Sequence, residues 1–461
     1  MKISLDALDE GDKIIISKNG ILDSSSVMGT TNHAQEEKTA IELQSFPFLL
    51  LLLKAGCVTG CAIGFIWLVS SMNISRLLDK EIFNFKKIEA PNQPSLPSVP
   101  NHIKHIPVSS NPSKNIPLIA GKLGDVSTFK VRGVWLATVQ NIDWPSGSNL
   151  SKDQQQKSLV AILDLMQELH FNTVYFQVRS QGDAFYRSRY EPWSRYLTSN
   201  QTDPGWDPLS FIIEQAKRRN IQVHAWINPY RAGFRGQKIH PKNIGSKFPQ
   251  YLYQYGSFQW LDPGAPEIQE HILKVVEDIA TRYDVAGIHF DDYFYPYPEE
   301  GKKFPDQDTY TKSRTTLGKN DWRRENVNYL VAQVSKITRK EGIEFSISPF
   351  GIYKSNHPPG IKGLSQFDSL YSDPLHWVSS NTVDRLIPQL YWSTNSQYQD
   401  YEKLLAWWNS KSRVLSGNAL YKLTSQEFSI EEVKKQIELN KDAEIDGFVF
   451  FSAKHLKGLR N

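Results

Sequence analysis

Short apolar runs alternate with helical patterns from Val131 to the end of the chain. Eight runs are rich in β-branched and aromatic residues, at positions 131–139, 172–178, 221–227, 285–291, 343–350, 383–391, 413–420 and 446–452. Between them, apolar residues recur every three or four positions, as in helices packed on a sheet. Such alternation is typical of a parallel α/β sheet, and eight βα units predict a closed (β/α)8 TIM barrel. Only AKHLKGLRN follows the last run, so the eighth helix is expected to be short or absent.

Local signals mark where several of these helices begin. Asp207 and Asp373 are N-cap residues, each followed by a proline at the first helical position. Ser429 and Glu432 have the spacing of a capping box. Two apolar stripes predict helix faces that pack on the sheet, namely Leu159, Ile162, Leu163, Met166 and Leu169, and Ile268, Ile272, Val275, Val276 and Ile279.

The pattern before residue 131 is different. Residues 1–45 are polar, show no clear hydrophobic period and are predicted to be a flexible tail. Residues 46–71, FPFLLLLLKAGCVTGCAIGFIWLVSS, are interrupted only by Lys54 and are long enough to cross a bilayer as a helix. We interpret them as a transmembrane or signal-anchor segment. Residues 72–130, with APNQPSLPSVP and IPVSSNPSKNIP, predict an extended Pro/Ser-rich linker. The barrel is assigned to residues 131–461.

Two alternatives remain for the apolar segment. It is also compatible with a buried core helix, and Val58-Thr59-Gly60-Cys61 is similar to a lipobox, although the basic region of a signal peptide is missing. The orientation is ambiguous, because the positive-inside tendency of Arg76, Lys80, Lys86 and Lys87 places the following side in the cytoplasm. The solvated linker favours the opposite side. We expect a membrane-anchored protein with its barrel outside the cytoplasm, in the periplasm or cell envelope.

Alternate residues of the predicted strands differ in character, and one set must face the barrel interior. The set assigned to the helix layer is apolar: Val174, Phe176 and Val178; Val223, Ala225 and Ile227; Ile288 and Phe290; Leu386, Pro388 and Leu390. The interior set is polar or aromatic: Tyr175, Gln177 and Arg179; His224, Trp226 and Asn228; His289 and Asp291; Gln389 and Tyr391. A purely structural interior is mostly branched aliphatic. The polar set therefore indicates either a functional cavity at the C-terminal strand ends or an internal hydrogen-bond network.

Composition narrows the classes of partner. Lys+Arg total 53 against 49 Asp+Glu, giving a net charge of +4 without a concentrated basic stripe, so no nucleic-acid partner is expected. Aromatic residues reach 12%, with 12 Trp and 20 Tyr, which suits either a site where flat rings meet a ligand or a large core. The two cysteines, Cys57 and Cys61, both lie in the apolar segment, so no disulfide framework is predicted for the barrel.

An aspartate pair ends the fourth run. Asp291 and Asp292 are followed by Tyr293, Phe294, Tyr295 and Tyr297. Paired carboxylates beside aromatic rings suit glycoside cleavage, which needs a proton donor and a second group that stabilises an oxocarbenium-like transition state. A metal ligand or a helix cap is the alternative use of such a pair. No His/Asp/Glu cluster at ligand spacing accompanies it, so we expect neither a metal nor a cofactor.

Motifs across residues 131–452 are similar to those of the glycosyl hydrolase-like 10 family. They are RGVWLATVQNIDWPS, FNTVYFQVRSQGDAFYRSRYEPWSRYLT, GWDPLSFIIEQAKRRNIQVHAWINPYRA, WLDPGAPEIQEHI, YDVAGIHFDDYFYPYP, DWRRENVN, FSISPFGIY and IPQLYW. The resemblance implies a (β/α)8 barrel that hydrolyses O-glycosyl bonds of a polysaccharide. Family members of known activity act on peptidoglycan glycan strands. The family pattern is matched at Asp291 and Asp292.

With that resemblance, roles can be assigned as hypotheses. Asp291 is expected to face the anomeric centre and Asp292 to donate the proton or to orient the donor, although the reverse assignment is equally compatible with the sequence. If the sugar carries a 2-acetamido group, its amide oxygen is a possible nucleophile and a carboxylate would orient the amide N–H. The residues expected to line sugar subsites are Gln177, Arg179, Asn228, Tyr230, Gln389, Tyr391 and Trp392, with Tyr293 and Tyr295 stacking on sugar faces. Asp143 or Asp183 is an alternative, more distant second carboxylate.

Two other functions are compatible with the pattern. A glycan-binding barrel without turnover needs only the aromatic residues, but an inward Asp291 is costly to bury without a task. An α-glucan hydrolase is the second, because GIHFD is also similar to the nucleophile strand of the α-amylase family. The fifth run, FSISPFG, has no acid at its end, which weighs against that assignment.

Overall fold

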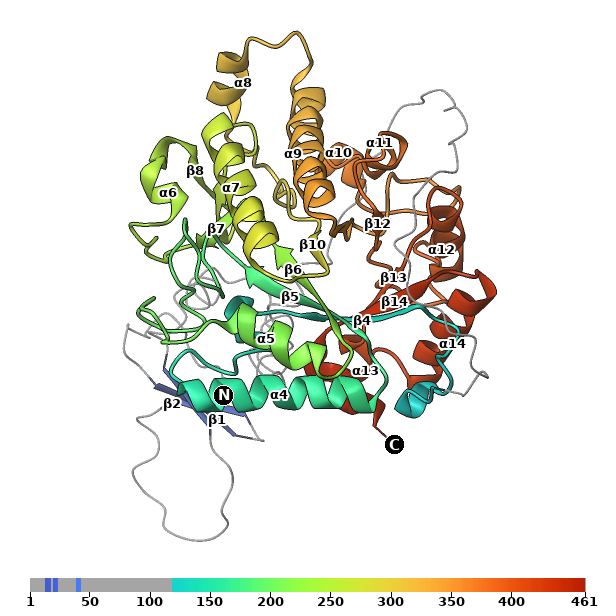
Figure 1. Cartoon of the computed structure of the whole chain (residues 1–461). Helices are drawn as coiled ribbons and strands as arrows, with labels where there is room; N and C mark the ends of the chain where they lie inside the picture. The colour runs from blue at the N-terminus through green and yellow to red at the C-terminus, as the bar shows by residue number, and fades with distance from the viewer. Residues whose placement is uncertain (1–12, 18–19, 24–38, 43–117, 461) are drawn as a thin grey trace. The chain divides into compact units, whose positions relative to one another are not determined.

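The computed structural model describes residues 13–17, 20–23, 39–42 and 118–460 (Figure 1). The chain divides into two units, Met1–Ile88 and Glu89–Asn461. In the first unit, β1 (Lys13–Ser17) pairs antiparallel with both β2 (Gly20–Asp23) and β3 (Thr39–Glu42). The sequence had indicated no regular structure there. The predicted membrane segment, residues 46–71, lies outside the described residues. Within the described ranges, none of the helices combines the length and apolar character that a membrane span requires.

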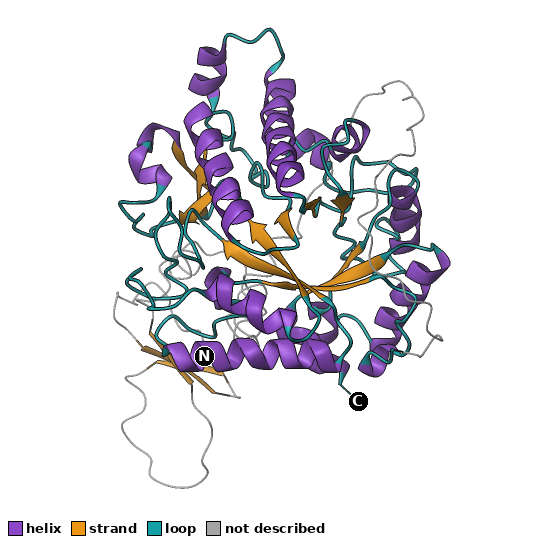
Figure 2. Cartoon of the chain, in the orientation of Figure 1, coloured by secondary structure: helices purple, strands orange, loops and turns teal. Residues whose placement is uncertain are grey.

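Eight parallel strands form the centre of the second unit, with helices packed around them (Figure 2). In chain order they are β4 (Val131–Leu136), β5 (Thr173–Arg179), β6 (Gln222–Ile227), β10 (Gly287–Phe290), β11 (Glu344–Ile347), β12 (Arg385–Leu386), β13 (Ser416–Asn418) and β14 (Gly447–Phe451). The sheet order is β12-β11-β10-β6-β5-β4-β14-β13. Seven of the eight predicted runs therefore contain one shorter strand, while β5 is as long as its run and is displaced by one residue.

The two ends of this curled sheet meet, which closes the barrel. Parallel bridges join Leu386 to Val414 and Gln389 to Gly417, next to β12 and β13. The Gly417 N–H donates to the Pro388 carbonyl at 2.9 Å, and the Gly417 carbonyl accepts from the Leu390 N–H at 2.8 Å. Closure leaves every barrel strand with two neighbours, as a (β/α)8 fold requires.

A helix follows each strand. The helices that directly precede the next barrel strand are α4 (Lys152–Glu168), α5 (Pro208–Lys217), α7 (Pro266–Arg282), α9 (Lys319–Glu341), α11 (Pro374–Ser379), α12 (Tyr401–Asn409) and α14 (Ile430–Asp442), while β14 is followed by the 3-10 helix η7 (Ala453–Leu459). Additional helices are η4 (Gly121–Leu123), η5 (Val139–Asn141), α6 (Ile244–Lys247), η6 (Pro249–Tyr251), α8 (Gln307–Ser313), α10 (Gln366–Ser369) and α13 (Tyr421–Thr424). Between β6 and α7, a small antiparallel sheet is built from β7 (Arg231–Phe234), β8 (Leu252–Tyr255) and β9 (Phe258–Leu261). The weak eighth helix expected from the sequence is confirmed.

The predicted helix starts are confirmed with one difference. The Asp207 carboxylate accepts from the Ser210 N–H at 3.0 Å, and the Asp373 carboxylate accepts from the His376 N–H at 3.2 Å. The Ser429 hydroxyl accepts from the Glu432 N–H at 3.2 Å. The reciprocal half of that capping box is absent from the hydrogen bonds described for α14, because the Glu432 carboxylate accepts from the backbone and hydroxyl of another loop.

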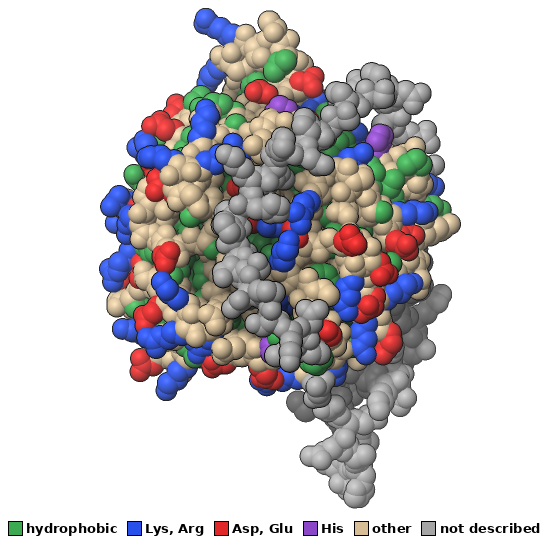
Figure 3. All heavy atoms as spheres, turned by 45° about the vertical axis from the view of Figure 1, so that its right-hand side comes forward, with side chains coloured by type: hydrophobic (Ala, Val, Ile, Leu, Met, Phe, Trp, Pro, Cys, Tyr) green, Lys and Arg blue, Asp and Glu red, His purple; other side chains and the backbone are tan. Residues whose placement is uncertain are grey.

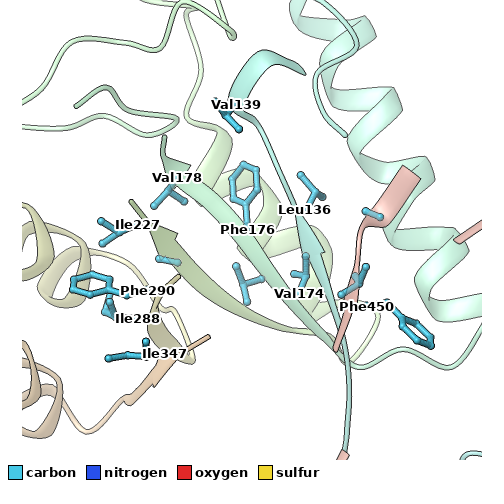
Figure 4. Close-up of a cluster of buried hydrophobic side chains, with 14 of the residues drawn as sticks. Leu136, Val139, Val174, Phe176, Val178, Ile227, Ile288, Phe290, Ile347 and Phe450 are labelled. Atoms are coloured by element: carbon cyan, nitrogen blue, oxygen red, sulfur yellow. The ribbon is translucent and has the colours of Figure 1, made fainter. Parts of the chain in front are cut away.

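Two separate hydrophobic clusters confirm the strand parity. The larger one lies between the strands and the helices and includes Val174, Phe176 and Ile288 (Figure 4). Ala225 and Leu386 belong to the same cluster. The smaller one fills the barrel interior, and its members are Trp135, Ala137, Tyr175, Trp226, Ile387, Leu415 and Val449. Burial of both layers by alternate residues of the same strands fixes the register, because a slip of one residue would exchange the two faces. The polar side chains near the Asp291–Asp292 pair are thereby held in place.

Candidate active site

Asp291 lies directly after β10, at the C-terminal end of the barrel strands, and is 5% exposed. Its Oδ2 accepts hydrogen bonds from Trp226 Nε1, at 3.1 Å, and from Asn228 Nδ2. Its Oδ1 accepts from the backbone N–H of Tyr293 at 3.1 Å. All three partners are neutral N–H groups, so they favour the ionised carboxylate without cancelling its charge.

Asp292 is 2% exposed and is held by a different set of partners. Its Oδ1 accepts from Gln389 Nε2 at 2.9 Å, and its Oδ2 accepts from the Tyr297 hydroxyl. The Gln389 amide is itself anchored, because the same nitrogen donates to the Ser348 carbonyl at 3.1 Å. Side chains that follow β6, β10 and β12 thus meet at one point of the barrel mouth, as in the active sites of barrel enzymes.

Burial and mutual repulsion set the proton affinity of the pair. Burial, together with the neighbouring Asp292 charge, raises the pKa of Asp291 from its usual 3.8 to about 7, although the Arg231 charge opposes the shift. Burial also raises the pKa of Asp292, against the hydrogen bonds from Tyr297 and Gln389. Two adjacent carboxyls titrate as a unit, so the pair holds one proton near neutral pH. That is the protonation state that general acid catalysis requires.

Amide side chains orient the partners of Asp291. Gln177 Oε1 accepts from the backbone N–H groups of Thr138 and Val139, both at 2.9 Å, so its Nε2 must be a donor. That nitrogen donates to Asn228 Oδ1 at 2.6 Å, which turns Asn228 Nδ2 toward Asp291. Gln177 and Asn228 point inward as predicted. Gln177 acts on the pair through Asn228 rather than by direct contact.

Deeper in the barrel, the polar interior forms a closed hydrogen-bond network. His289 Nε2 lies 3.0 Å from Trp135 Nε1 and 3.2 Å from the Ser348 hydroxyl, while His289 Nδ1 lies 2.9 Å from the Ser346 hydroxyl. Burial lowers the pKa of His289 well below its usual value, so the ring is neutral. Burial lowers the pKa of His224 as well. For His289 the structural alternative, a hydrogen-bond network, is correct, whereas the buried Nδ1 of His224 has no hydrogen-bond partner among the described residues.

Arg179 is not brought to the site. The register shifts between Gln177 and Arg179, so Arg179 pairs with the outward-facing Ile227 rather than continuing the inward series. Its fully buried guanidinium binds both carboxylate oxygens of Glu191, at 2.7 to 3.0 Å, and donates to the Asn228 and Pro229 carbonyls. The inward orientation predicted for Arg179 is wrong, and the β-bulge is the physical reason.

Two predicted sugar-binding tyrosines also point elsewhere. Tyr230 is fully buried in the core between strands and helices, close to the charges of Asp262 and Arg179. Tyr295 is 1% exposed and packs edge to face against Phe304 and Tyr371, with ring centroids 5.5 and 5.1 Å apart. Neither ring is available to a sugar held at the aspartate pair.

The other predicted aromatic residues border the pair and are half-buried. Tyr293 lies 5.6 Å from the Tyr297 ring and 6.1 Å from the Trp260 ring, measured between centroids. Trp392 packs edge to face against Phe350 at 5.6 Å. Burial raises the pKa of Tyr391, and the charges of Tyr421 and of both aspartates raise it further. The Tyr391 hydroxyl is therefore within electrostatic reach of the pair.

Asp143 and Asp183 have structural tasks. Asp143 accepts from the Ala137 N–H at 2.7 Å and from the Ser452 hydroxyl at 2.6 Å, and burial raises its pKa to about 6. Asp183 accepts from Ser180, Gln181 and Ser194, at 2.5 to 3.2 Å. Their oxygens are occupied inside loops, which leaves the Asp291–Asp292 pair as the carboxylates at the mouth.

Two residues of the site were not predicted as such. Tyr297 holds Asp292, and Arg231 places its guanidinium 5.3 Å from the Tyr293 ring centroid while lowering the pKa of both aspartates. Arg231 begins β7, in an insertion whose course the strand pattern does not reveal. For the part of the chain that the structure describes, no group of three or more His, Cys, Asp or Glu side chains is arranged to hold a metal ion.

A (β/α)8 barrel that carries two buried carboxyls with raised pKa values at its mouth has the architecture of a glycoside hydrolase. Comparison with known proteins supports this class and makes it specific. The model of the glycosyl hydrolase-like 10 family matches residues 130–434. The chain belongs to this family.

Its relatives include two proteins named as glycosyl hydrolases. Over 365 residues it is 37% identical to Glycosyl hydrolase YngK of Bacillus subtilis (strain 168), covering 74% of this chain and 71% of the relative. Over 372 residues it is 34% identical to Glycosyl hydrolase DigH of Escherichia coli (strain K12), covering 72% and 84%. Among solved structures, the PgaB (BpsB) glycoside hydrolase domain from Bordetella bronchiseptica matches with a TM-score of 0.47 and 15% identity, covering 72% of this chain and 95% of that one.

Proposed function

We propose that this barrel hydrolyses O-glycosyl bonds in the glycan strands of peptidoglycan, with Asp291 and Asp292 as its catalytic pair. The observation that carries the proposal is the pair itself, because both carboxyls are buried, adjacent and raised in pKa. A charged pair in such a position is costly unless it has a task. Membership of the glycosyl hydrolase-like 10 family supports hydrolysis as that task.

The hydrogen-bond partners suggest which aspartate carries the proton. Asp291 faces three N–H donors that cannot accept a hydrogen bond, so a proton on Asp291 would displace one of them. Asp292 faces the Tyr297 hydroxyl, which can turn from donor to acceptor. We therefore assign the leaving-group proton to Asp292. Asp291 then remains ionised and either stabilises positive charge at the anomeric centre or orients a 2-acetamido group of the substrate.

Half-buried side chains around the pair provide the surface for the sugars. Tyr293, Tyr391 and Trp392 offer aromatic rings at the rim, and Gln389, which follows β12 two strands away from β10, donates to Asp292. Gln177 and Asn228 act as positioning residues, because their amides hold Asp291 in place. The pair is thus oriented by groups that remain fixed whether or not substrate is bound.

The proposal is tested by incubating the full chain with purified peptidoglycan, with and without stem peptides, and by mass analysis of the released fragments. Asp291→Asn and Asp292→Asn are each expected to lower the rate by about 100-fold or more. Asp442→Asn is the matched control, because Asp442 is exposed at the end of α14. Release of no fragment from peptidoglycan would leave a binding protein or an α-glucan hydrolase as the alternatives. Full activity of both site variants would overturn the site assignment.

We further propose that residues 46–71 anchor the protein in a membrane and that the barrel works outside the cytoplasm, where peptidoglycan is found. The apolar composition of that segment and the Pro/Ser-rich linker support this arrangement. Protease added to intact cells after opening of the outer layers should then cut the barrel from its anchor. Protection of the barrel until the inner membrane is broken would contradict it.

A further inference from the structure

A cavity is lined in part by the loop that follows the aspartates, through Tyr295, Pro296 and Pro298. Its volume is about 360 Å³, within the usual range for small-molecule sites. Along the loop, Tyr293 and Tyr297 lie on the side of the aspartates, while Tyr295 and Pro296 line this cavity. Three peptide units separate Asp292 from Tyr295, a span of at most about 11 Å. Both sites are therefore within reach of one short oligosaccharide.

The walls of the cavity combine an aromatic floor with a cationic rim. Tyr255, Tyr295 and Phe304 are each less than 10% exposed and form the floor with Tyr371. The rim is exposed, and it includes Lys302 and Lys303. Such a combination suits a ligand with a flat, partly apolar body and a negative charge at one end.

The charges around the cavity do not cancel. Four cations line it, namely Lys302, Lys303, Lys319 and Arg323. Two carboxylates pair with them. Asp306 forms ion pairs with Lys319, at 2.8 Å, and with Arg323, at 2.6 Å, while Glu299 forms an ion pair with Lys302. Two positive charges therefore remain in excess, four minus two. Within the described ranges, no carboxylate forms an ion pair with Lys303, so this ammonium is available to a ligand.

The beginning of α9 adds to the positive potential. Lys319 and Asn320 are its first two residues, and both line the cavity. The N-cap is Gly318, which has no side chain to accept from the first free N–H groups. An anion in the cavity would meet those N–H groups and the positive end of a helix of 23 residues.

We propose that this cavity binds a sugar unit that bears a carboxylate, as an acidic-sugar subsite beside the catalytic loop. The aromatic floor takes the sugar ring, and Lys303 and the start of α9 take the carboxylate. The assignment deepens the proposed function and rests on it only for the source of the sugar. A peptidoglycan strand without its stem peptides offers a free lactyl carboxylate in every disaccharide, whereas a stem peptide converts this carboxyl into an amide. A strand that places its acidic sugar here would present a defined neighbouring bond to Asp291 and Asp292.

The test uses monosaccharides, which contain no bond to cleave, so it is independent of hydrolysis. The full chain is titrated with N-acetylmuramic acid and with N-acetylglucosamine, which lacks the lactyl carboxylate, and binding is followed by calorimetry or NMR. The acid is expected to bind about tenfold or more tightly. Inorganic phosphate serves as a second probe. Equal affinity for the two sugars, or binding of phosphate without binding of the acid, would overturn the proposal.

Variants locate the binding in this cavity. Lys303→Met is expected to weaken binding of the acidic sugar about fivefold and to leave the neutral sugar unaffected. Lys336→Met removes the same charge from an exposed position of α9, about 25 Å along the helix axis from its start at the cavity, and should change nothing. Equal effects of the two substitutions would refute the location. Glycan strands whose carboxyls have been reduced should then be cleaved with a higher KM. If no glycan were cleaved but the acidic sugar still bound, only the proposed hydrolysis would be refuted.

Discussion

Replacing Asp291 by asparagine is expected to stabilise the folded barrel at alkaline pH while it abolishes catalysis. In the folded protein the pKa of Asp291 is raised from 3.8 to about 7. Between those values the unfolded chain has released a proton that the folded protein still binds, so the stability of the wild type falls as the pH rises and is constant above the folded pKa. The two carboxyls bind this proton as a pair, with Asp292 as its carrier in the proposed mechanism. Asparagine at position 291 removes the second charge that makes the pair retain the proton, so the variant escapes this loss.

The magnitude follows from the shift and from the hydrogen bonds. A shift of roughly 3 pKa units corresponds to about 4 kcal/mol, which is an upper value for the pair. The asparagine oxygen can accept from Trp226 and Asn228 at the Oδ2 position, but its NH2 group then meets the Tyr293 N–H, and one hydrogen bond worth about 1 kcal/mol is lost. The variant should be less stable by about 1 kcal/mol near pH 4 and more stable by about 3 kcal/mol near pH 8.

Urea unfolding at several pH values, followed by tryptophan fluorescence, measures this difference directly. Asp442→Asn provides the control, because this exposed residue should change the stability by the same small amount at every pH. If the difference between wild type and Asp291→Asn stayed constant from pH 4 to pH 8, the electrostatic reasoning would be refuted. If it changed in the opposite direction, the fold would stabilise the doubly ionised pair, against the raised pKa values of both aspartates.

Two further substitutions probe the partners around the pair and the buried ion pair behind it. Trp226→Phe removes the N–H that donates to Asp291 at 3.1 Å, which should raise the pKa of the pair by about one unit. The alkaline limb of the kcat/KM profile should then move to higher pH by the same amount, and an unmoved limb would contradict this. Arg179→Met leaves Glu191 buried without its bidentate partner and should cost about 3 to 5 kcal/mol in urea unfolding. Arg187→Met, at an exposed ion pair, should cost less than about 1 kcal/mol, and equal losses would argue against the burial effect.

The barrel and the orientation of the central residues could be predicted because periodicity records burial. Strand residues alternate between the helix layer and the interior, and the structure contains both as separate hydrophobic clusters. Asp291, Asn228 and Gln389 therefore appear at the mouth where the pattern placed them. Their hydrogen bonds join side chains of different strands. The repeating pattern within each strand is enough to predict that these side chains all face the interior.

The failures occur where the pattern ends. The β-bulge after Gln177 turns Arg179 outward, and nothing in the alternation of apolar residues marks it. Beyond β10 the chain leaves the sheet, so the inward or outward direction of Tyr295 depends on loop packing against Phe304 rather than on strand parity. Arg231 was missed because its insertion returns to the site through an antiparallel sheet. Residues 46–71 stay a prediction, since they lie outside the described residues.

The pairing of β14 with β4 has a consequence for the synthesis of the protein. β4 is the first barrel strand to leave the ribosome, and its partner β14 is the last. The Asp143 carboxyl, after β4, accepts a hydrogen bond from the hydroxyl of Ser452, after β14, which is 309 residues away in the sequence. Until the final residues are made, one edge of β4 lacks its partner and can pair with other chains. Cells that produce this barrel must therefore shield an open sheet edge during almost the whole of its translation, and a delay in the last strand endangers the product more than a delay in any earlier one.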